Sequence, residues 1–294
     1  MDYEKKEFDG GKLMTFDELK SRYSSIERIK KGGQKIVYKV KTLDGKIFAL
    51  KIIPNSTDAR VLQEIEVINS INIPNIPVIV DSGIVYDDSV GENVLFIVEE
   101  FIEGVSCRDW ISAGNKMSLT QAYRTMNALL EIEIELEKHK ILHRDINPNN
   151  IILCPGGEII LIDFGLVKKL GGLSLTQTAA LHGPFTPGYA PHEQFANMKL
   201  EQDVRTDLFQ IGVTIYECCI GKNPFVEPNE SIYDIMTRTM SFIPPALVLA
   251  GDNTGLFSQF VNMLMAKNQS QRPDTAHDAM RYLEAIKSSL ELEV

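Results

Sequence analysis

The segment 143–165 constrains the fold of this chain more than any other segment. It begins with a polar loop, His-Arg-Asp-Ile-Asn-Pro-Asn-Asn at 143–150, and continues with apolar runs at 151–153 and 159–162. A Cys-Pro-Gly-Gly turn separates the two runs, and Asp163-Phe164-Gly165 follows the second run. Short apolar runs around a tight turn predict a buried β-hairpin that ends at Asp163.

Three oxygen-bearing side chains are expected to converge at the end of this hairpin. Because a hairpin folds back on itself, Asp163 should return to the neighbourhood of Asp145 and Asn150. Two carboxylates and an amide form a ligand set that suits Mg²⁺ or Mn²⁺ rather than zinc. The alternative is a buried hairpin whose terminal carboxylates only cap turns.

The loop and the end of the hairpin resemble two motifs of protein kinases, the catalytic loop HRDxxxxN and the metal motif DFG. A second segment, 183–194, reads Gly-Pro-Phe-Thr-Pro-Gly-Tyr-Ala-Pro-His-Glu-Gln. It resembles the GTPGYxAPE segment in the variant common among bacterial eukaryote-like Ser/Thr kinases. Glu193 matches the Glu of that motif, and the resemblance gives it Arg272 as its partner. Small-molecule phosphotransferases share a looser HxDxxxxN pattern but lack this second segment.

Length and composition are those of a globular protein. The chain has 294 residues, 44% of them hydrophobic, and a net charge of −10. This charge argues against binding to nucleic acid or to an anionic membrane, and no apolar run reaches the roughly 18 residues of a membrane span. The four cysteines lack the spacing of metal ligands, and the adjacent Cys218 and Cys219 are expected to be buried thiols. We therefore predict a reducing, cytoplasmic setting.

Two regions of different character are expected. Strand patterns occur at 26–29, 36–40, 47–53, 76–85 and 94–101, with one helical pattern at 58–71, which predicts a small antiparallel sheet with one helix. Helical patterns dominate after residue 105, and Ser118 with Gln121 forms a capping-box signature for a helix at 119–139. The resemblance implies an α+β, bilobal kinase fold: an N-terminal extension at 1–23 and a kinase domain at 24–290, with its N-lobe at 24–101 and its C-lobe at 105–290.

Lys51 lies in a predicted strand that is apolar on both faces, where an unpaired lysine would be costly to bury. In the following helical pattern, Glu64 shares a face with Val61, Ile65 and Ile68. An inward Lys and an inward Glu are natural partners. The resemblance assigns Lys51 to the α and β phosphates of ATP and Glu64 to its support.

Other nucleotide-binding residues follow from the resemblance. The glycine-rich loop is degenerate here: only Gly32 matches one of its three glycines, Lys30 and Lys35 replace the other two, and Gly33 is extra. Backbone groups of Glu100 and Ile102 would contact adenine. Glu99 would take the gatekeeper position, where it could narrow the pocket or pair with a nearby cation. The full set of expected nucleotide-binding residues is Ile29, Gly32, Gly33, Val37, Ala49, Lys51, Glu100, Ile102 and Ile152.

The resemblance also assigns the catalytic roles. Asp145 would orient a substrate hydroxyl and accept its proton, while Asn150 and Asp163 would hold the metal ion. Arg144 would pair with a phosphorylated activation loop, in which Ser174, Thr176 and Thr178 are candidate phosphosites. Asp207 would cap a buried helix and hold the catalytic loop.

One position departs from the family pattern. Protein Ser/Thr kinases usually have Lys two residues after the catalytic Asp, and this chain has Asn147. Loss of that charge predicts slower chemistry, and an Asn147→Lys substitution is then expected to raise the rate.

The sequence thus predicts an ATP-dependent protein kinase that acts on Ser/Thr hydroxyls of protein substrates and phosphorylates itself. The alternative is a pseudokinase or signalling scaffold that binds nucleotide with little catalysis. The thin glycine loop and Asn147 favour the alternative. The features that favour the enzyme are the intact Lys51, Glu64, Asp145, Asn150 and Asp163.

Overall fold

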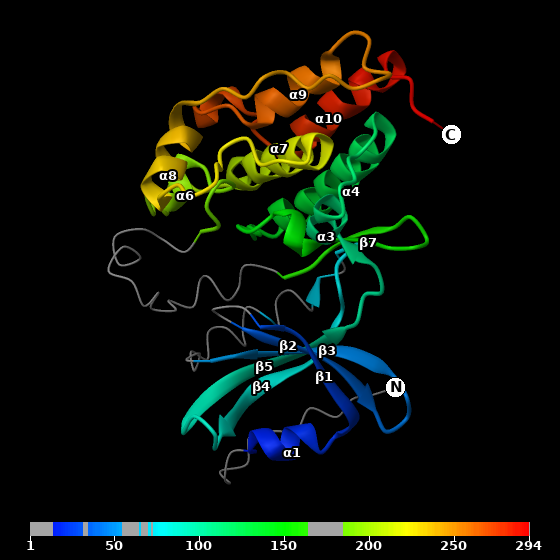
Figure 1. Cartoon of the computed structure of the whole chain (residues 1–294), viewed down its shortest axis with the longest axis vertical. Helices are drawn as coiled ribbons and strands as arrows, with labels where there is room; N and C mark the ends of the chain where they lie inside the picture. Colours follow the sequence, from blue (N-terminus) through cyan, green and yellow to red (C-terminus); the bar gives the residue numbers. More distant parts are fainter. Residues whose placement is uncertain are drawn as a thin grey trace. The chain divides into compact units, whose positions relative to one another are not determined.

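The computed structural model divides the chain into two compact units (Figure 1). It describes residues 14–31, 35–54, 65, 70–71, 73–163 and 185–293. The first unit comprises Met1–Ser70 with Val78–Phe101, and the second comprises Ile71–Pro77 with Ile102–Val294. A small unit built on an antiparallel sheet and a larger, mostly helical unit confirm the predicted α+β, bilobal fold.

The N-terminal unit contains a five-stranded antiparallel sheet with the order β1-β2-β3-β5-β4. All five predicted strands are present, and β3 has the predicted bounds. The strands are β1 (Tyr23–Lys31), β2 (Ile36–Thr42), β3 (Ile47–Ile53), β4 (Ile79–Asp87) and β5 (Glu92–Glu100).

A short helix, α1 (Phe16–Lys20), packs on this sheet. Thr15 and Glu18 form a capping box at its start, and Leu19 is fully buried in a cluster that includes Leu50. Part of the expected N-terminal extension is therefore integrated into the unit. The helix expected at 58–71 lies outside the described residues except for Ile65 and Ser70, which are helical, and Ile71, which is in a bend.

The C-terminal unit is built from helices and one small sheet. The sheet has the order β6-β7-β8 (Val105–Ser106, Ile151–Leu153, Ile159–Leu161). Its helices include α3 (Cys107–Ser112), α4 (Leu119–Lys138), α6 (His192–Phe195), α7 (Val204–Ile220), α8 (Ile232–Ser241), α9 (Leu256–Leu264) and α10 (Ala276–Ile286), with the short 3-10 helices η1 (Pro148–Asn150), η3 (Gln269–Gln271) and η4 (Lys287–Ser289).

Helix α7 lies at the centre of this unit and packs against both α4 and α9 (Figure 1). Nearly every residue of α7 is buried, as its apolar sequence predicts. Asp203 caps its start, and Gly221 ends it in the left-handed conformation (φ 86°). Side chains of this helix bind the backbone of the loop 143–150 and hold it in place.

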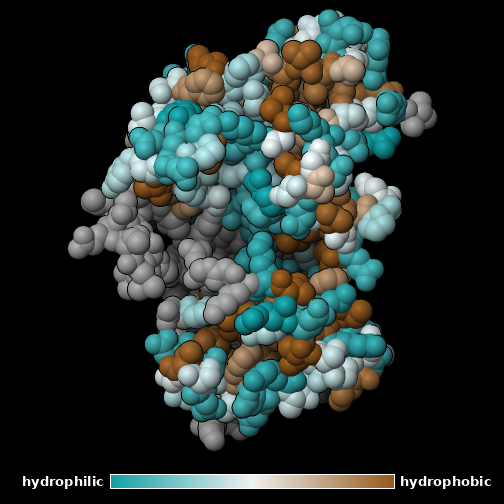
Figure 2. Space-filling view, in the orientation of Figure 1, coloured by the Kyte–Doolittle hydropathy of each residue, from teal (hydrophilic) through white to brown (hydrophobic). Residues whose placement is uncertain are grey.

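The described part of the chain has neither a helix that could span a membrane nor a disulfide bond. None of the helices described there has both the length and the apolar character that a membrane span requires. On the face that Figure 2 shows, hydrophobic residues form small patches among hydrophilic ones. All four cysteines are free thiols.

Candidate active site

A polar stripe on α7 holds the loop 143–150. Asp207, Gln210 and Thr214 are spaced i, i+3 and i+7, which places them on one face of the helix. The Asp207 carboxylate accepts the backbone N–H groups of His143 (2.8 Å) and Arg144 (2.7 Å). Asp207 therefore holds the loop, as predicted, but the expectation that it caps the helix is wrong, because Asp203 is the N-cap of α7 and Asp207 lies within the first helical turn.

The same stripe binds the next residue of the loop, Ile146. The Gln210 side-chain oxygen accepts the Ile146 N–H at 2.7 Å, and the Thr214 hydroxyl donates to the Ile146 carbonyl at 3.3 Å. Sequence reasoning missed Gln210 and Thr214. Their helical spacing from Asp207 is the signal that could have revealed them.

Arg144 is held in a left-handed backbone conformation (φ 63°) that non-glycine residues seldom adopt. Its carbonyl accepts hydrogen bonds from the side-chain amides of Gln194 (2.8 Å) and Gln210 (3.1 Å). These bonds, with the one from its N–H to Asp207, fix the turn that presents Asp145. The candidate phosphosites Ser174, Thr176 and Thr178 lie outside the described residues, so the pairing of Arg144 with a phosphate stays a prediction.

The Asp145 carboxylate is oriented through both of its oxygens. Oδ1 accepts the Thr186 hydroxyl at 2.5 Å, and Oδ2 accepts the Asn150 side-chain amide at 3.0 Å. Because the Thr186 hydroxyl donates to Oδ1, this oxygen is positioned to accept a proton from a hydroxyl group. Sequence reasoning gave Thr186 no contact with Asp145, because the two are 41 positions apart.

The hairpin brings Asp163 back to Asn150, as predicted. β7 and β8 are antiparallel neighbours, and the Ile162 N–H donates to the Asn150 carbonyl at 2.8 Å, so Asp163 follows directly. The Asn150 amide nitrogen also donates to the Asp145 carbonyl at 2.8 Å, which leaves its side-chain oxygen as the acceptor end. One amide oxygen and one carboxylate fit a Mg²⁺ ion that takes its remaining ligands from phosphates and water.

Asn147 is a structural member of the loop. Its side chain is almost fully buried (2% exposed), and its amide nitrogen donates to the Asp145 carbonyl at 2.9 Å. Its oxygen accepts the backbone N–H and the side-chain N–H of Asn149, both at 3.0 Å, and thereby caps η1. The expectation that a lysine at position 147 would raise the rate did not take into account that the substitution removes these three hydrogen bonds.

In the N-terminal unit, Lys51 on β3 forms an ion pair with Glu99 on the adjacent strand β5. Both residues are buried, with exposed fractions of 6% and 8%. Of the two roles considered for Glu99, pairing with a cation is therefore the one observed. Glu64 lies outside the described residues, and its pairing with Lys51 stays a prediction.

The remaining nucleotide-binding candidates of the N-terminal unit lie on its strands. Val37 on β2 and Ala49 on β3 are buried, whereas Ile29 on β1 is exposed. The Glu100 N–H donates to the Val78 carbonyl at 2.9 Å. Gly32 and Gly33 lie outside the described residues.

Two further candidates, Ile102 and Ile152, belong to the C-terminal unit. Ile152 lies on β7 between Ser106 on β6 and Ile160 on β8. Nucleotide binding by the whole expected set stays a prediction.

The predicted pair of Glu193 and Arg272 is confirmed. Their charged atoms are 2.5 Å apart, and the Arg272 side chain is fully buried. The Arg272 guanidinium also donates to the carbonyls of Ala266 (2.8 Å) and Arg205 (3.0 Å). The pair joins α6 to the loop after α9, across 79 positions of sequence.

A second cluster fixes the segment that carries Thr186. Arg108 on α3 donates to the Glu217 carboxylate at 2.7 Å and to the Tyr189 hydroxyl at 2.5 Å. The Tyr189 hydroxyl in turn donates to Glu217. Burial, followed by the charge of Glu217, raises the pKa of Tyr189, so the hydroxyl stays protonated and able to donate. Nothing local in the sequence signals this cluster, because its members are far apart along the chain.

Two carboxylates of the C-terminal unit are deeply buried. Burial raises the pKa of Asp207, and the hydrogen bonds from Arg144 and His143 act in the opposite direction. Burial also raises the pKa of Glu133 on α4, and the charges of Asp207 and Glu137 add to this effect. Within the described part of the chain, neither carboxylate oxygen of Glu133 has a hydrogen-bond partner.

Comparisons with known proteins agree with this geometry. The family model described as protein kinase domain matches residues 23–283, and the chain therefore belongs to the protein kinase family.

Curated relatives with similar sequences come from several bacteria. A protein of Streptomyces coelicolor named "Probable serine/threonine-protein kinase SCO3848" is 32% identical over 173 residues, which cover 58% of this chain and 25% of that protein. Proteins named "Probable serine/threonine-protein kinase PknB" from Lactococcus lactis and Bifidobacterium longum are each 28% identical, over 69% and 87% of this chain. The matches span only 32% and 38% of those two relatives.

Proposed function

We propose that this protein transfers the γ-phosphate of Mg-ATP to Ser or Thr hydroxyls of protein substrates. The observation that carries the proposal is the orientation of the Asp145 carboxylate between the Asn150 amide and the Thr186 hydroxyl. The names of the bacterial relatives support the same activity. The free thiols support a reducing, cytoplasmic location.

Asp145 has the geometry of a group that positions a nucleophile. In the proposed reaction, the substrate hydroxyl oxygen forms a bond to the γ-phosphorus, the bond to the bridging oxygen breaks, and ADP leaves with that electron pair. The hydroxyl proton passes to Asp145. Asn150 keeps the carboxylate in place through its bonds to Asp145 Oδ2 and to the Asp145 carbonyl.

Asn150 and Asp163 are the proposed metal ligands, and Lys51 is the proposed ligand of the α and β phosphates. A bound Mg²⁺ ion would neutralise charge that develops on the phosphate oxygens. Asn150 presents its amide oxygen because its nitrogen is committed to Asp145. Lys51 is held inward by its ion pair with Glu99, on the adjacent strand of the sheet.

The proposed specificity for Ser and Thr rests on Thr186. Its hydroxyl is bound to Asp145, and the cluster of Arg108, Tyr189 and Glu217 fixes the backbone three residues further on. We infer that Thr186 sets the position of the acceptor segment relative to Asp145. Autophosphorylation at Ser174, Thr176 or Thr178 belongs to the same proposal.

A peptide assay tests the activity. The full chain is incubated with Mg-ATP and a library of Ser-, Thr- and Tyr-containing peptides, and ADP and phosphopeptides are measured. We expect equal amounts of ADP and phosphopeptide, with phosphate on Ser and Thr. Asp145→Asn should abolish both products, whereas Asp274→Asn, the same change at an exposed carboxylate of this unit, should abolish neither.

The alternative, a pseudokinase, predicts another outcome of the same assay. Mg-ATP would raise the melting temperature of the protein, but no phosphopeptide would form, and Asp145→Asn would behave like the wild type. Such a result would contradict the proposed function.

A further inference from the structure

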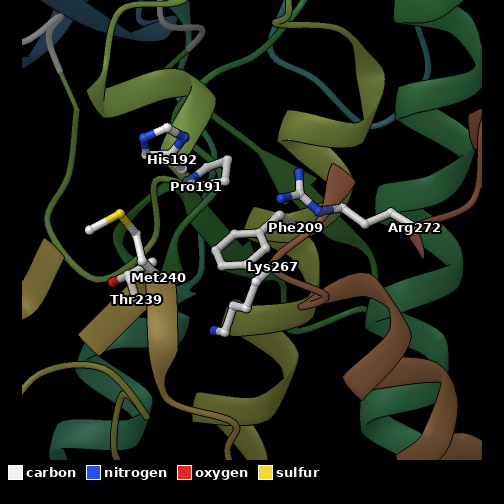
Figure 3. Close-up of a pocket in the computed structure, with 7 residues that line it drawn as sticks. All are labelled: Pro191, His192, Phe209, Thr239, Met240, Lys267 and Arg272. Carbon is white, nitrogen blue, oxygen red and sulfur yellow. The ribbon is translucent and has the colours of Figure 1, made fainter. Parts of the chain in front are cut away.

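A pocket of about 200 Å³ lies within the C-terminal unit, among α6, α7, α8 and the loop that follows α9. Figure 3 shows the Lys267 side chain beside the Phe209 ring of α7, with Met240 of α8 to the left among the lining residues. Pro191 and His192 close another side. None of the pocket's residues belongs to the set that binds Asp145 or the expected metal.

The lining of this pocket carries positive charge without an acidic counterpart. Lys267 and Arg272 contribute to it, and none of the described residues that line it is acidic. Arg272 is neutralised by Glu193 at 2.5 Å, outside the lining. Lys267 has no such counter-charge among the described residues, so it is the cation available to a ligand.

The ammonium group of Lys267 is buried in an unusual way. Its Nζ atom is shielded from solvent and has no hydrogen-bond partner in the part of the chain that the structure describes. It lies 3.9 Å from the centroid of the Phe225 ring and 5.5 Å from that of Phe209. Cation–π contacts stabilise the charge but satisfy none of its three N–H donors.

Burial and a neighbouring positive charge both disfavour the charged form of Lys267. Burial, followed by the charge of Arg272, lowers the pKa of Lys267 to about 7. A buried polar atom without a partner in a native protein calls for an explanation, and a bound ion or ligand is one that also supplies a counter-charge. An anion in the pocket would supply both the counter-charge and the acceptor.

We propose that this pocket binds the carboxylate of a small organic acid, with Lys267 as the cation that receives it. The volume suits one carboxylate with a small apolar body rather than a nucleotide. Pro191, Phe209 and Met240 form apolar walls, which favour such a body over a strongly hydrated ion such as phosphate. A rotation of the flexible lysine stem turns the ammonium from the Phe225 ring to the ligand.

The remaining polar group of the lining agrees with a monoanion. The Thr239 hydroxyl donates to the Ile235 carbonyl at 2.8 Å. Its proton is therefore not available as a second hydrogen-bond donor to the ligand. A single unneutralised cation matches a single carboxylate. This inference does not rest on the proposed kinase activity, and its test needs no turnover.

Benzoate is the probe, and the lysine side-chain nitrogen is the reporter. The full chain, labelled with ¹⁵N-lysine, is titrated with sodium benzoate and, in a parallel arm, with sodium phosphate, both at constant ionic strength. We expect a saturable change in the Lys267 ¹⁵Nζ resonance with benzoate alone, and a higher pKa of Lys267 in its presence. Equal or stronger binding of phosphate would overturn the assignment to a carboxylate.

Two variants locate the site. Lys267→Met keeps the length of the side chain without its charge, and we expect at least about tenfold weaker binding of benzoate, measured by calorimetry. Lys199→Met, the same change at an exposed lysine, should bind like the wild type. Met240→Trp fills the pocket from α8 and should also abolish binding. This second variant keeps the test valid if Lys267→Met does not fold. No saturable binding to the wild type, or binding that both pocket variants retain, would overturn the proposal.

Discussion

Lys51 and Glu99 form a buried ion pair between neighbouring strands, β3 and β5. A lysine inside a strand that is apolar on both faces requires a counter-charge, and Glu99 supplies one from within the same sheet. The pair also gives Glu99 a structural role at the position that the resemblance assigns to the gatekeeper. The contribution of this ion pair to stability can be measured separately from the proposed role of Lys51 in phosphate transfer.

Lys51→Met should destabilise the N-terminal unit by about 3 kcal/mol, because the Glu99 carboxylate then stays buried without its Lys51 partner. Glu99→Met should cost a similar amount for the reverse reason. The double variant should recover most of that loss, since two apolar side chains replace the pair. Urea denaturation of the four proteins gives the coupling energy.

Activity should not follow stability in this series. The double variant should fold well and transfer no phosphate, because the amine proposed to hold the α and β phosphates is absent. Additive destabilisation in the double variant would contradict the pairing. Full activity of Lys51→Met would contradict the assigned role of Lys51.

Asn147→Lys should lower kcat rather than raise it. The substitution removes the amide that donates to the Asp145 carbonyl and the oxygen that caps η1, at about 1 kcal/mol for each bond. It also forces a charged side chain into a site that is 2% exposed. A loss of at least about tenfold in kcat, measured with a peptide substrate, is expected.

Two other changes separate the bonds of Asn147. Asn147→Asp keeps the capping oxygen but loses the donor to Asp145 and buries a carboxylate beside the Asp145 carbonyl, so kcat and the melting temperature should both fall while the KM for ATP changes little. Asn149→Ala removes only a side-chain donor to Asn147, and its kcat should stay near that of the wild type. A rate gain in Asn147→Lys would contradict this account. It would instead support the first interpretation, in which the chain is slow because it lacks the lysine charge at position 147.

Glu133→Leu should stabilise the C-terminal unit by about 2 kcal/mol at pH 7. The carboxylate is fully buried, and neither of its oxygens has a hydrogen-bond partner within the described part of the chain. Leucine suits a helix face that already buries Leu129, Leu130 and Leu136. Thermal and urea denaturation measure the gain.

The pH dependence of that gain has a definite sign. Burial and the neighbouring carboxylates raise the pKa of Glu133 in the folded protein, so the folded state retains a proton that the unfolded chain releases above about pH 4.5. Wild-type stability therefore falls as pH rises above that value, and the advantage of the Leu variant grows. Glu131→Leu on the exposed face of the same helix should give no such trend. An advantage that shrinks as pH rises would rule out this explanation.

The sequence predicted best what local patterns determine. The five strands, the long helix α4 and the return of the hairpin to Asn150 follow from apolar periodicity, a capping box and a tight turn. The contact of Asp207 with the catalytic loop and the pairing of Glu193 with Arg272 followed from resemblance to a family. Composition and periodicity alone would not have supplied them.

What the sequence did not predict depends on contacts between distant elements. The bond from Thr186 to Asp145 and the cluster of Arg108, Tyr189 and Glu217 join segments that share no local pattern. Asn147 was interpreted as the absence of a lysine, because a motif records residue types and not the hydrogen bonds they make. The burial of Lys267 among aromatic rings likewise appears only once α7, the segment after α7 and the loop after α9 are packed.

The most direct test of the central claim is the intact mass of the purified chain after incubation with Mg-ATP, beside an Asp145→Asn control. Our account predicts that the wild type gains one or more phosphates and that the control gains none. Peptide mapping should then place the phosphate on Ser or Thr. An equal gain of phosphate by the Asp145→Asn variant would contradict the assignment of Asp145 as the residue that accepts the hydroxyl proton.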